Sequence, residues 1–453
     1  AYEQVLLARR CRLHRRCAAL LEEAPGAHGA DAASEIGRHY DQAGEPRLAA
    51  RALARAGEGY LGLLAAREAV SHLRRAWELV HAPLVAGADP SLCLRIGLAL
   101  GRALNSLDRA GEASSVLEAL DPDELSGSDR IRLAEAWIEG AWVRFSESGE
   151  VTRPRALLER GLALAGDTRE LAVRAHVYRI RICHLDGSVG EAAESARRVT
   201  ELATAAGERF GIALGLGNEG YVLCDAGRLD RARACCEEAL ALAREARHEV
   251  ASALAAGWLA KVHAFRGDTD AALRAAELAR DLGTRTAQAG AVYNAELWTG
   301  YVHLLRDEPK RALEVLERLA EINARWPTTL DWMALARLET GRLDEAAALA
   351  RRCLAAEPPR LVRIRALRTL GLALGLAKHP DREAAERAMG EALGLALEFG
   401  LRPHVADVQQ AFAELCQRAG DERRAAYYGA RAEREWEACG MRLHVERARA
   451  GRA

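Results

Sequence analysis

The chain has 453 residues, of which half are hydrophobic and only 5% are aromatic. Its 64 Lys and Arg residues are balanced by 65 Asp and Glu residues, and this balance argues against a dedicated nucleic-acid surface, which normally shows as a clustered excess of base. No apolar run approaches the ~18 residues of a membrane span. The ten cysteines include no Cys-x-x-Cys pair and are typical of small buried residues in a reducing compartment. We therefore expect a cytoplasmic protein.

The N-terminal stretch combines an arginine-rich segment with a glycine turn. Five arginines surround Leu13-His14 in residues 9–16, and His39-Tyr40 precedes the turn at Gly44. We expect residues 1–60 to form N-terminal helices that link a missing upstream region to the first repeat. Because the chain starts without Met, we expect it to be a piece of a longer protein.

A recurring turn continues along the rest of the chain. In each case a Gly or Asp is followed by polar residues and, five positions later, by an Ala. The clearest alanines are Ala192, Ala232, Ala272 and Ala312, which lie 40 residues apart. Glycine can end a helix in the left-handed conformation, and an acidic residue favours the start of the next helix. Each unit is therefore predicted to be a helix, a tight turn and a second helix, with the Ala at a close helix crossing.

The spacing of these units predicts the fold class. A helix pair buries its apolar face only against its neighbours, so the core grows lengthwise. We predict an all-α, right-handed superhelical solenoid of antiparallel helix pairs, with a period of about 40 residues, repeats over 61–430 and a capping helix over 431–453. The pattern resembles the tetratricopeptide repeat (TPR) family, whose standard period is ~34 residues. HEAT-like repeats are the alternative.

Both ends of the chain resemble one setting of such repeats. The Leu13-His14 segment, the His39-Tyr40 turn and the closing segment with Trp436 resemble the TPR arms of bacterial STAND-type signalling ATPases. That group includes multidomain Ser/Thr kinases, cyclases and maltose-activator-like regulators. The resemblance implies that the chain is the sensor or protein-binding arm of such a protein. The ATPase itself is not in this sequence, since it contains no Gly-x-x-x-x-Gly-Lys-Ser/Thr motif.

A column of side chains at 40-residue spacing is the candidate binding surface. Tyr221, Lys261 and Tyr301 repeat one position of the first helix of each pair, which by the TPR resemblance faces the concave groove. Residues further up the column and about one turn away extend the set. The candidate groove residues are Arg174, Arg181, His184, Tyr221, Asp225, Lys261, Asn294 and Tyr301. The alternative is a solvated helix face along which the tyrosines extend.

The histidines and cysteines do not predict a metal or catalytic site. His263 and His303 are also 40 residues apart, but no carboxylate or Cys recurs with them at ligand spacing. Cys183 and His184 are adjacent, and neighbours on a helix point about 100° apart, so they do not chelate one ion jointly. We therefore expect no cofactor, no metal and no catalytic residues.

Together these patterns predict a non-catalytic protein–protein interaction scaffold or sensor arm. It would bind a partner peptide or domain in the concave groove, possible partners including the parent protein's own ATPase domain, and neither nucleic acid nor a membrane is expected. A small-molecule effector, such as a sugar or metabolite, is the alternative, and an enzyme with an unrecognised groove site is the third. A deep pocket at Tyr221, Lys261 and Tyr301 would favour the small molecule, and an open groove would favour a protein.

Overall fold

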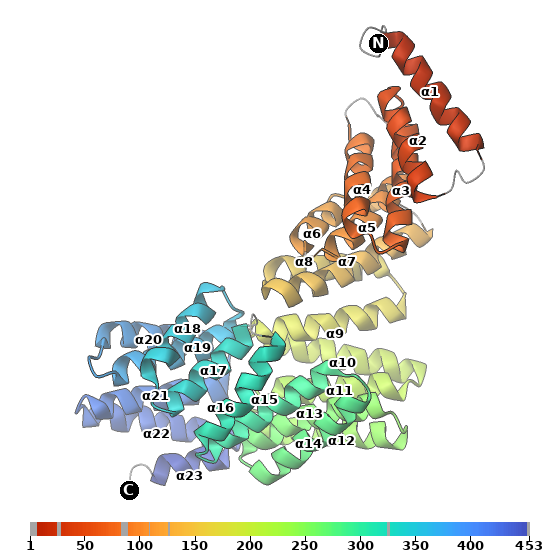
Figure 1. The fold of residues 1–453 in the computed structure, drawn as a ribbon. Coiled ribbons are helices and arrows are strands. Elements are labelled where there is room, and N and C mark those ends of the chain that lie inside the picture. Colours follow the sequence, from red (N-terminus) through yellow and green to blue (C-terminus); the bar gives the residue numbers. More distant parts are fainter. Residues whose placement is uncertain are drawn as a thin grey trace. The chain divides into compact units, whose positions relative to one another are not determined.

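The computed structural model describes residues 7–24, 29–82, 89–107, 109–125, 127–323 and 327–450. Within these ranges the chain forms 23 α-helices and one short 3-10 helix, with no strand. Most consecutive helices pack against one another (Figure 1), which confirms the all-α, TPR-like solenoid of helix pairs. None of the described helices is long and apolar enough to cross a membrane. Residues 1–6 and 451–453 of the expected end segments lie outside the described residues.

The helices fall into two compact units, each of which is described by itself. Unit 1 comprises Ala1–Ser148 and Thr152–Ala175, and unit 2 comprises Gly149–Val151 and His176–Ala453. The elements of unit 1 are α1 (Leu7–Glu23), α2 (Ala30–Gln42), α3 (Pro46–Gly62), α4 (Ala66–Val80), α5 (Pro90–Asn105), α6 (Ala110–Glu118), η2 (Pro122–Glu124), α7 (Gly127–Ser148) and α8 (Thr152–Ala165). Helix α9 (Arg169–Leu185) crosses the boundary between the units.

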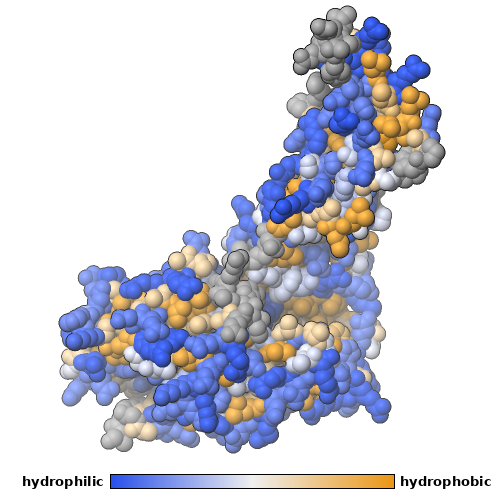
Figure 2. All heavy atoms as spheres, in the orientation of Figure 1, coloured by the Kyte–Doolittle hydropathy of each residue, from blue (hydrophilic) through white to orange (hydrophobic). Residues whose placement is uncertain are grey.

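Unit 2 continues the series of helix pairs and ends with a single helix. Its elements are α10 (Val189–Ala206), α11 (Arg209–Leu223), α12 (Leu229–Glu245), α13 (Glu249–Arg266), α14 (Thr269–Arg285), α15 (Ala289–Leu305), α16 (Pro309–Asn323), α17 (Pro327–Glu339), α18 (Leu343–Ala355), α19 (Arg360–Leu376), α20 (Arg382–Glu398), α21 (Arg402–Arg418), α22 (Glu422–Cys439) and α23 (Arg442–Ala450). The odd-numbered helices α9 to α21 are the first helices of their pairs, and the even-numbered ones are the second. In the space-filling view, hydrophilic residues cover much of the visible face of each unit, and hydrophobic residues show in patches between them (Figure 2).

The 40-residue period is visible in the helix boundaries. Four successive first helices begin at Arg169, Arg209, Glu249 and Ala289, each 40 residues after the one before. The four alanines that the sequence places at close helix crossings are at most 1% exposed. Small side chains at these positions let the two helices of a pair approach closely, so the local pattern and the packing agree.

The turn glycines of the first pairs of unit 2 show that this unit closes on itself. Gly187, Gly227 and Gly267 have φ values of 83°, 73° and 85°, the left-handed region that glycine enters at little cost. A Cβ at Gly187 would lie 3.2 Å from the ring of Phe399. At Gly227 it would lie 2.4 Å from the sulfur of Cys439, and at Gly267 2.5 Å from Cβ of Leu443. The last repeats and α23 therefore pack directly against the turns of the first pairs.

Candidate binding cavity

A buried ion pair lies where the concave faces of the first helices of unit 2 meet. Lys261 of α13 and Asp225, in the turn after α11, have 2.5 Å between Nζ and Oδ2, and both side chains are 2% exposed. Lys261 also donates a hydrogen bond of 3.1 Å to the carbonyl oxygen of Tyr221. Its Nζ lies 3.9 Å from the centroid of the Tyr221 ring. The ammonium group is thus held by a carboxylate, a carbonyl and the face of an aromatic ring.

Two buried histidines from distant repeats complete the cluster. His184 of α9 places Nε2 2.6 Å from Oδ2 of Asp225, and His404 of α21 places Nε2 3.0 Å from Oδ1. Asp225 therefore joins α9, α13 and α21 through one carboxylate. Among the described residues, no group of three or more His, Cys, Asp and Glu could hold a metal ion.

Burial and charge together set the protonation states of this cluster. Burial alone would raise the pKa of Asp225, but Lys261 and the hydrogen bonds of the two histidines hold it well below its usual range. Burial alone would lower the pKa of Lys261, but the carboxylate of Asp225 outweighs it and that pKa is raised. Burial lowers the pKa of His184 to about 4, against the opposing effect of Asp225. Near neutral pH the cluster is therefore a salt bridge flanked by a neutral His184.

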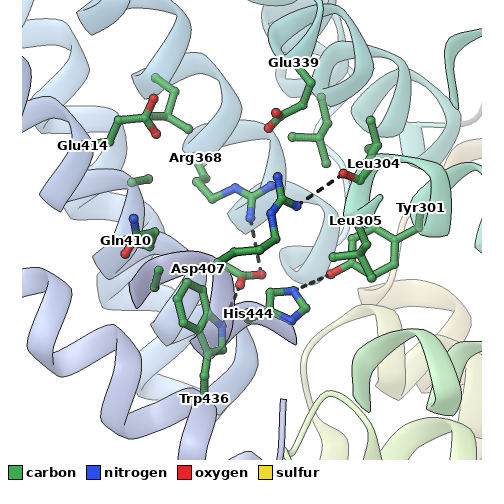
Figure 3. A pocket seen from close by; sticks show the side chains of 15 residues that line it. Tyr301, Leu304, Leu305, Glu339, Arg368, Asp407, Gln410, Glu414, Trp436 and His444 are labelled. Atoms are coloured by element: carbon green, nitrogen blue, oxygen red, sulfur yellow. Dashed lines mark hydrogen bonds and ion pairs between the residues drawn. The ribbon is translucent and has the colours of Figure 1, made fainter. Parts of the chain in front are cut away.

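Figure 3 shows an open cavity of about 330 Å³, called here the outer cavity. It lies next to this cluster, because Tyr301, Arg368 and Asp407 line both the cavity and the interior that holds the cluster. Its walls come from six helices: α15, α17, α19, α21, α22 and α23. Its polar and aromatic lining residues are Tyr301, Glu339, Arg368, Asp407, Gln410, Glu414, Trp436, His444 and Arg447. Both signs of charge are therefore present in one concave, partly apolar site, as is common in ligand-binding pockets.

Helix α23 covers one side of the outer cavity. The hydroxyl of Tyr301 lies 3.1 Å from Nε2 of His444, and Arg447 donates a hydrogen bond of 3.3 Å to the carbonyl oxygen of Leu304. Burial raises the pKa of Tyr301 and lowers the pKa of His444 to about 4, so both groups are neutral near pH 7. Helix α23 is thereby attached to α15, 143 positions earlier in the chain.

The remaining charges of the outer cavity are arranged around Arg368. Arg368 and Asp407 form an ion pair of 3.3 Å. In Figure 3 the carboxylates of Glu339 and Glu414 lie above Arg368, and His444 lies below it. Desolvation and the nearby Glu339 carboxylate raise the pKa of Glu414. The two carboxylates thus repel each other across a space that a ligand could enter.

The structure brings most of the predicted groove residues together, but not on an open surface. His184, Tyr221, Asp225 and Lys261 line one interior, and Asn294 is buried in α15 outside that lining; these five residues are 2% to 7% exposed. Arg181 lies with its guanidinium carbon 5.8 Å from the centroid of the Tyr221 ring, at the edge of the same group. Tyr301 lines both the cluster and the outer cavity. The binding role of these residues stays a prediction, because in this closed arrangement five of them face other side chains of the same chain.

Arg174, the remaining predicted residue, belongs to unit 1. Its guanidinium lies 3.1 Å from Glu135 and 2.8 Å from Glu139, on the preceding first helix α7. This is an exposed ion-pair network of the ordinary kind. Arg174 is therefore assigned to the surface of unit 1 and not to the cavity of unit 2.

Sequence reasoning missed the part of the site that comes from α19 and α21. Arg365, Arg368 and His404 line the same interior as Lys261. They escaped notice because the 40-residue spacing ends after α15, and a search at fixed spacing stops there. Arg365 and Arg368, two of the four arginines of helix α19, were the available signal, because they lie among its apolar residues.

Comparisons with known proteins support the fold. No family model matches the chain, and no curated protein matches it. The crystal structure of a Rap protein complexed with Competence and Sporulation Factor has a TM-score of 0.55 and 12% identity, and covers 76% of this chain and 98% of that chain. This similarity shows a shared TPR-like helical-repeat fold.

Two further solved structures have TM-scores below 0.5. The Cut9–Hcn1 hetero-tetramer of the APC/C has a TM-score of 0.44 and 13% identity, and covers 99% of this chain and 97% of that chain. A STAND protein with a TPR sensor from Pyrococcus horikoshii has a TM-score of 0.38 and 12% identity, and covers 77% of this chain and 52% of that chain. This chain thus spans about half of the STAND protein's length.

Proposed function

We propose that the chain is a non-catalytic recognition arm in which unit 2 binds a peptide, or a short segment of a partner protein, in the outer cavity. The observation that carries this proposal is the cavity itself, about 330 Å³ in volume and lined by six helices. Ligand sites are typically clefts of ~300–1,000 Å³ that combine apolar walls with a few polar groups. The concave faces of repeat solenoids are extended binding surfaces. The Rap protein of similar fold was crystallised with Competence and Sporulation Factor, which supports binding by this fold.

The predicted groove residues take two roles in this proposal. Tyr301 contacts the ligand directly, because its side chain lines the outer cavity. The buried group around Asp225 and Lys261 holds α11 and α13 against α21 and thereby sets the width of the cavity. The walls of the cavity are then ordered before the ligand binds, so binding costs less conformational entropy.

A cavity-filling variant with a matched control tests the proposal. Ala448 of α23 lines the outer cavity, and Ala450 of the same helix is exposed away from it. We expect a random displayed heptapeptide library, selected on the whole chain, to yield peptides that bind Ala450→Trp as they bind the native protein. The same peptides should lose at least tenfold in affinity for Ala448→Trp. Failure to enrich any peptide, or equal affinity for both variants, would refute peptide binding in this cavity.

A small-molecule effector is the second candidate, and the size of the cavity also suits it. A volume of about 330 Å³ is at the lower end of the range for small-molecule sites, so it suits a small molecule as well as part of a peptide. Thermal unfolding of the chain in the presence of a panel of sugars and metabolites tests this candidate. A compound that stabilises the native chain and Ala450→Trp, but not Ala448→Trp, would support it. If no compound does so while peptides bind, the small-molecule reading is refuted.

We also propose that the chain is the arm of a STAND-type signalling ATPase. The support is the resemblance of residues 9–44 and of the closing segment, and it rests on sequence. In α2 the hydroxyl of Tyr40 donates a hydrogen bond of 2.9 Å to Glu22 of α1, so the residues that carry the resemblance pack as one folded element. Reading the coding sequence upstream of Ala1 tests the proposal. A nucleotide-binding domain with a P-loop is expected there, and its absence would refute this assignment.

A further inference from the structure

The interior of unit 2 has a smaller and less open end, called here the inner chamber, which adjoins the outer cavity. Its volume is about 50 Å³, and the two spaces share Tyr301, Leu335, Arg368 and Asp407 among their lining residues. The chamber is lined by the first helices of seven successive pairs, α9 to α21, or by the turns that follow them. A ligand in the outer cavity is therefore next to a small space that every repeat of unit 2 helps to form.

Two buried tryptophans of the inner chamber have indole N–H groups without an acceptor. Trp298 of α15 and Trp332 of α17 line the chamber and are 4% and 5% exposed. Their rings are packed edge to face with centroids 6.0 Å apart. Among the described residues neither indole nitrogen finds a hydrogen-bond partner. Buried Trp N–H groups usually have one, so this pair points to an acceptor that is supplied from outside the chain.

The two arginines of α19 add further unused donors. Arg365 donates through Nε to Asp331 at 2.6 Å, and Arg368 pairs through Nη1 with Asp407 at 3.3 Å. These side chains are 12% and 15% exposed. Nη2 of Arg365 and Nε of Arg368 are buried and have no acceptor among the described residues. Four N–H donors without an acceptor thus belong to residues of three helices that line one small chamber.

The carboxylates already present in the chamber are occupied, and Nδ1 of His184 is the acceptor among its side chains that has no donor within the described residues. Both oxygens of Asp225 accept from Lys261 or a histidine, and both oxygens of Asp407 pair with Arg368 or with the indole of Trp436. The chamber therefore has more donors than acceptors. A group with two acceptor atoms would satisfy this surplus of donors, and a carboxylate offers about four lone-pair sites on two oxygens, which the arginine N–H groups bind by charge-assisted hydrogen bonds.

We propose that the inner chamber is a subsite for a carboxylate group of the ligand, with the remainder of that ligand in the outer cavity. This rests on the proposed binding role of the outer cavity. A water needs ~10–15 Å³ of such space, so the chamber has room for about three to five water-sized groups, which is enough for a carboxylate. The carboxylate belongs either to a peptide, at its C-terminus or on an acidic side chain, or to a free small acid. Ordered water alone is the competing occupant.

Substitution of Trp by Phe removes the N–H donor and keeps an aromatic ring, which makes the test specific. The probe is sodium formate, the smallest carboxylate, compared with sodium chloride at equal ionic strength in thermal unfolding of the whole chain. We expect formate to raise the melting temperature more than chloride does in the native chain. This excess should fall by at least half in Trp332→Phe and in Trp298→Phe. It should be unchanged in Trp137→Phe, since Trp137 of unit 1 donates to the carbonyl oxygen of Leu117 and lies in the other unit.

A peptide arm separates the sources of the carboxylate. Peptides selected on the native chain are compared with their C-terminal amides and with versions in which Asp and Glu are replaced by Asn and Gln. We expect one of these neutralisations to weaken binding at least tenfold, and Trp332→Phe to reduce that difference to less than threefold.

The formate and peptide experiments also distinguish a failure of the carboxylate subsite from a failure of the proposed function. If the excess effect of formate is absent, or equal in all variants, the chamber holds water only and the subsite is refuted. If selected peptides bind but no neutralisation weakens them, the peptide carboxylate is refuted while the proposed function stands. If no peptide binds and the formate effect still depends on Trp332, peptide binding is refuted and the subsite takes a free small acid.

Discussion

Units 1 and 2 are built from the same kind of helix pair, but they differ in how many polar side chains they bury. Among the described residues, Ser114 is the one buried polar side chain of unit 1, and all other buried polar or charged residues belong to unit 2. Charged groups of unit 1 pair at its surface instead, as Arg75 does with both oxygens of Asp41 at 2.8 and 2.9 Å. The side chain of Arg75 remains 48% exposed in that pair.

This difference is one reason to place the proposed site in unit 2. Burying a polar group costs free energy unless it is fully hydrogen-bonded, and an apolar core would stabilise a solenoid as well. Unit 1 shows that the repeat folds with such a core, built around residues such as Ile36 and Leu73. The charges inside unit 2 are therefore not required by the repeat itself. They are what a binding role would add.

The largest expected effect is on the buried ion pair. Asp225→Ala leaves Lys261 charged and buried without its carboxylate, so we expect a loss of about 3–5 kcal/mol in the free energy of unfolding of unit 2. Asp41→Ala, the matched change at the surface pair of unit 1, should cost about 0–1 kcal/mol. Urea denaturation, with hydrogen exchange of α11 and α13 against α3 and α4, measures both. Equal costs for the two variants would contradict the comparison.

The next effect is a loss of stability at acidic pH, which follows from the protonation of His184. The folded pKa of His184 is about 4 and its unfolded value is about 6.5, so the neutral form is favoured by folding. Its contribution is complete above pH ~6.5 and is lost as the pH falls towards 4, by about 2–3 kcal/mol at pH 4.5. Urea denaturation at pH 7 and 4.5 checks this. His184→Gln keeps an N–H donor for Asp225 but does not titrate. Its free energy of unfolding should therefore fall by about 2–3 kcal/mol less than that of the native chain between pH 7 and 4.5. An identical fall in both proteins would contradict the lowered pKa of His184.

The smallest effect tests how α23 is attached. Gly267→Ala and Gly420→Ala both place a side chain at positive φ, 85° and 78°, and each should cost on the order of 1 kcal/mol. Only the first also meets another segment, because its Cβ would lie 2.9 Å from the backbone nitrogen of Leu443, whereas a Cβ at Gly420 meets nothing within 4 Å. We expect amide exchange in α23 to be at least tenfold faster in Gly267→Ala and unchanged in Gly420→Ala. Equal exchange would mean that this turn does not hold α23.

The local sequence pattern was enough to predict the helix pairs, but it was not enough to predict all residues of the candidate site. The turn glycines, the small residue at each crossing and the 40-residue period follow from steric rules that act over a few residues. The polar column at Tyr221, Lys261 and Tyr301 was visible for the same reason, since residues at equal repeat positions share a face. Its partners Trp332 and Arg365 lie in pairs with a different spacing, so their place beside Lys261 could not be inferred from the period.

The sequence by itself determined an all-α repeat protein, its period and a polar stripe along its first helices. Only the tertiary structure decided that unit 2 closes on itself, so that this polar stripe lies in its interior. That outcome depends on contacts such as His404 with Asp225 and His444 with Tyr301, between residues 179 and 143 positions apart. Such contacts arise from small rotations that accumulate over successive pairs, and no single pair encodes their sum. The same closure converts a predicted open groove into a buried salt bridge, an inner chamber and an outer cavity.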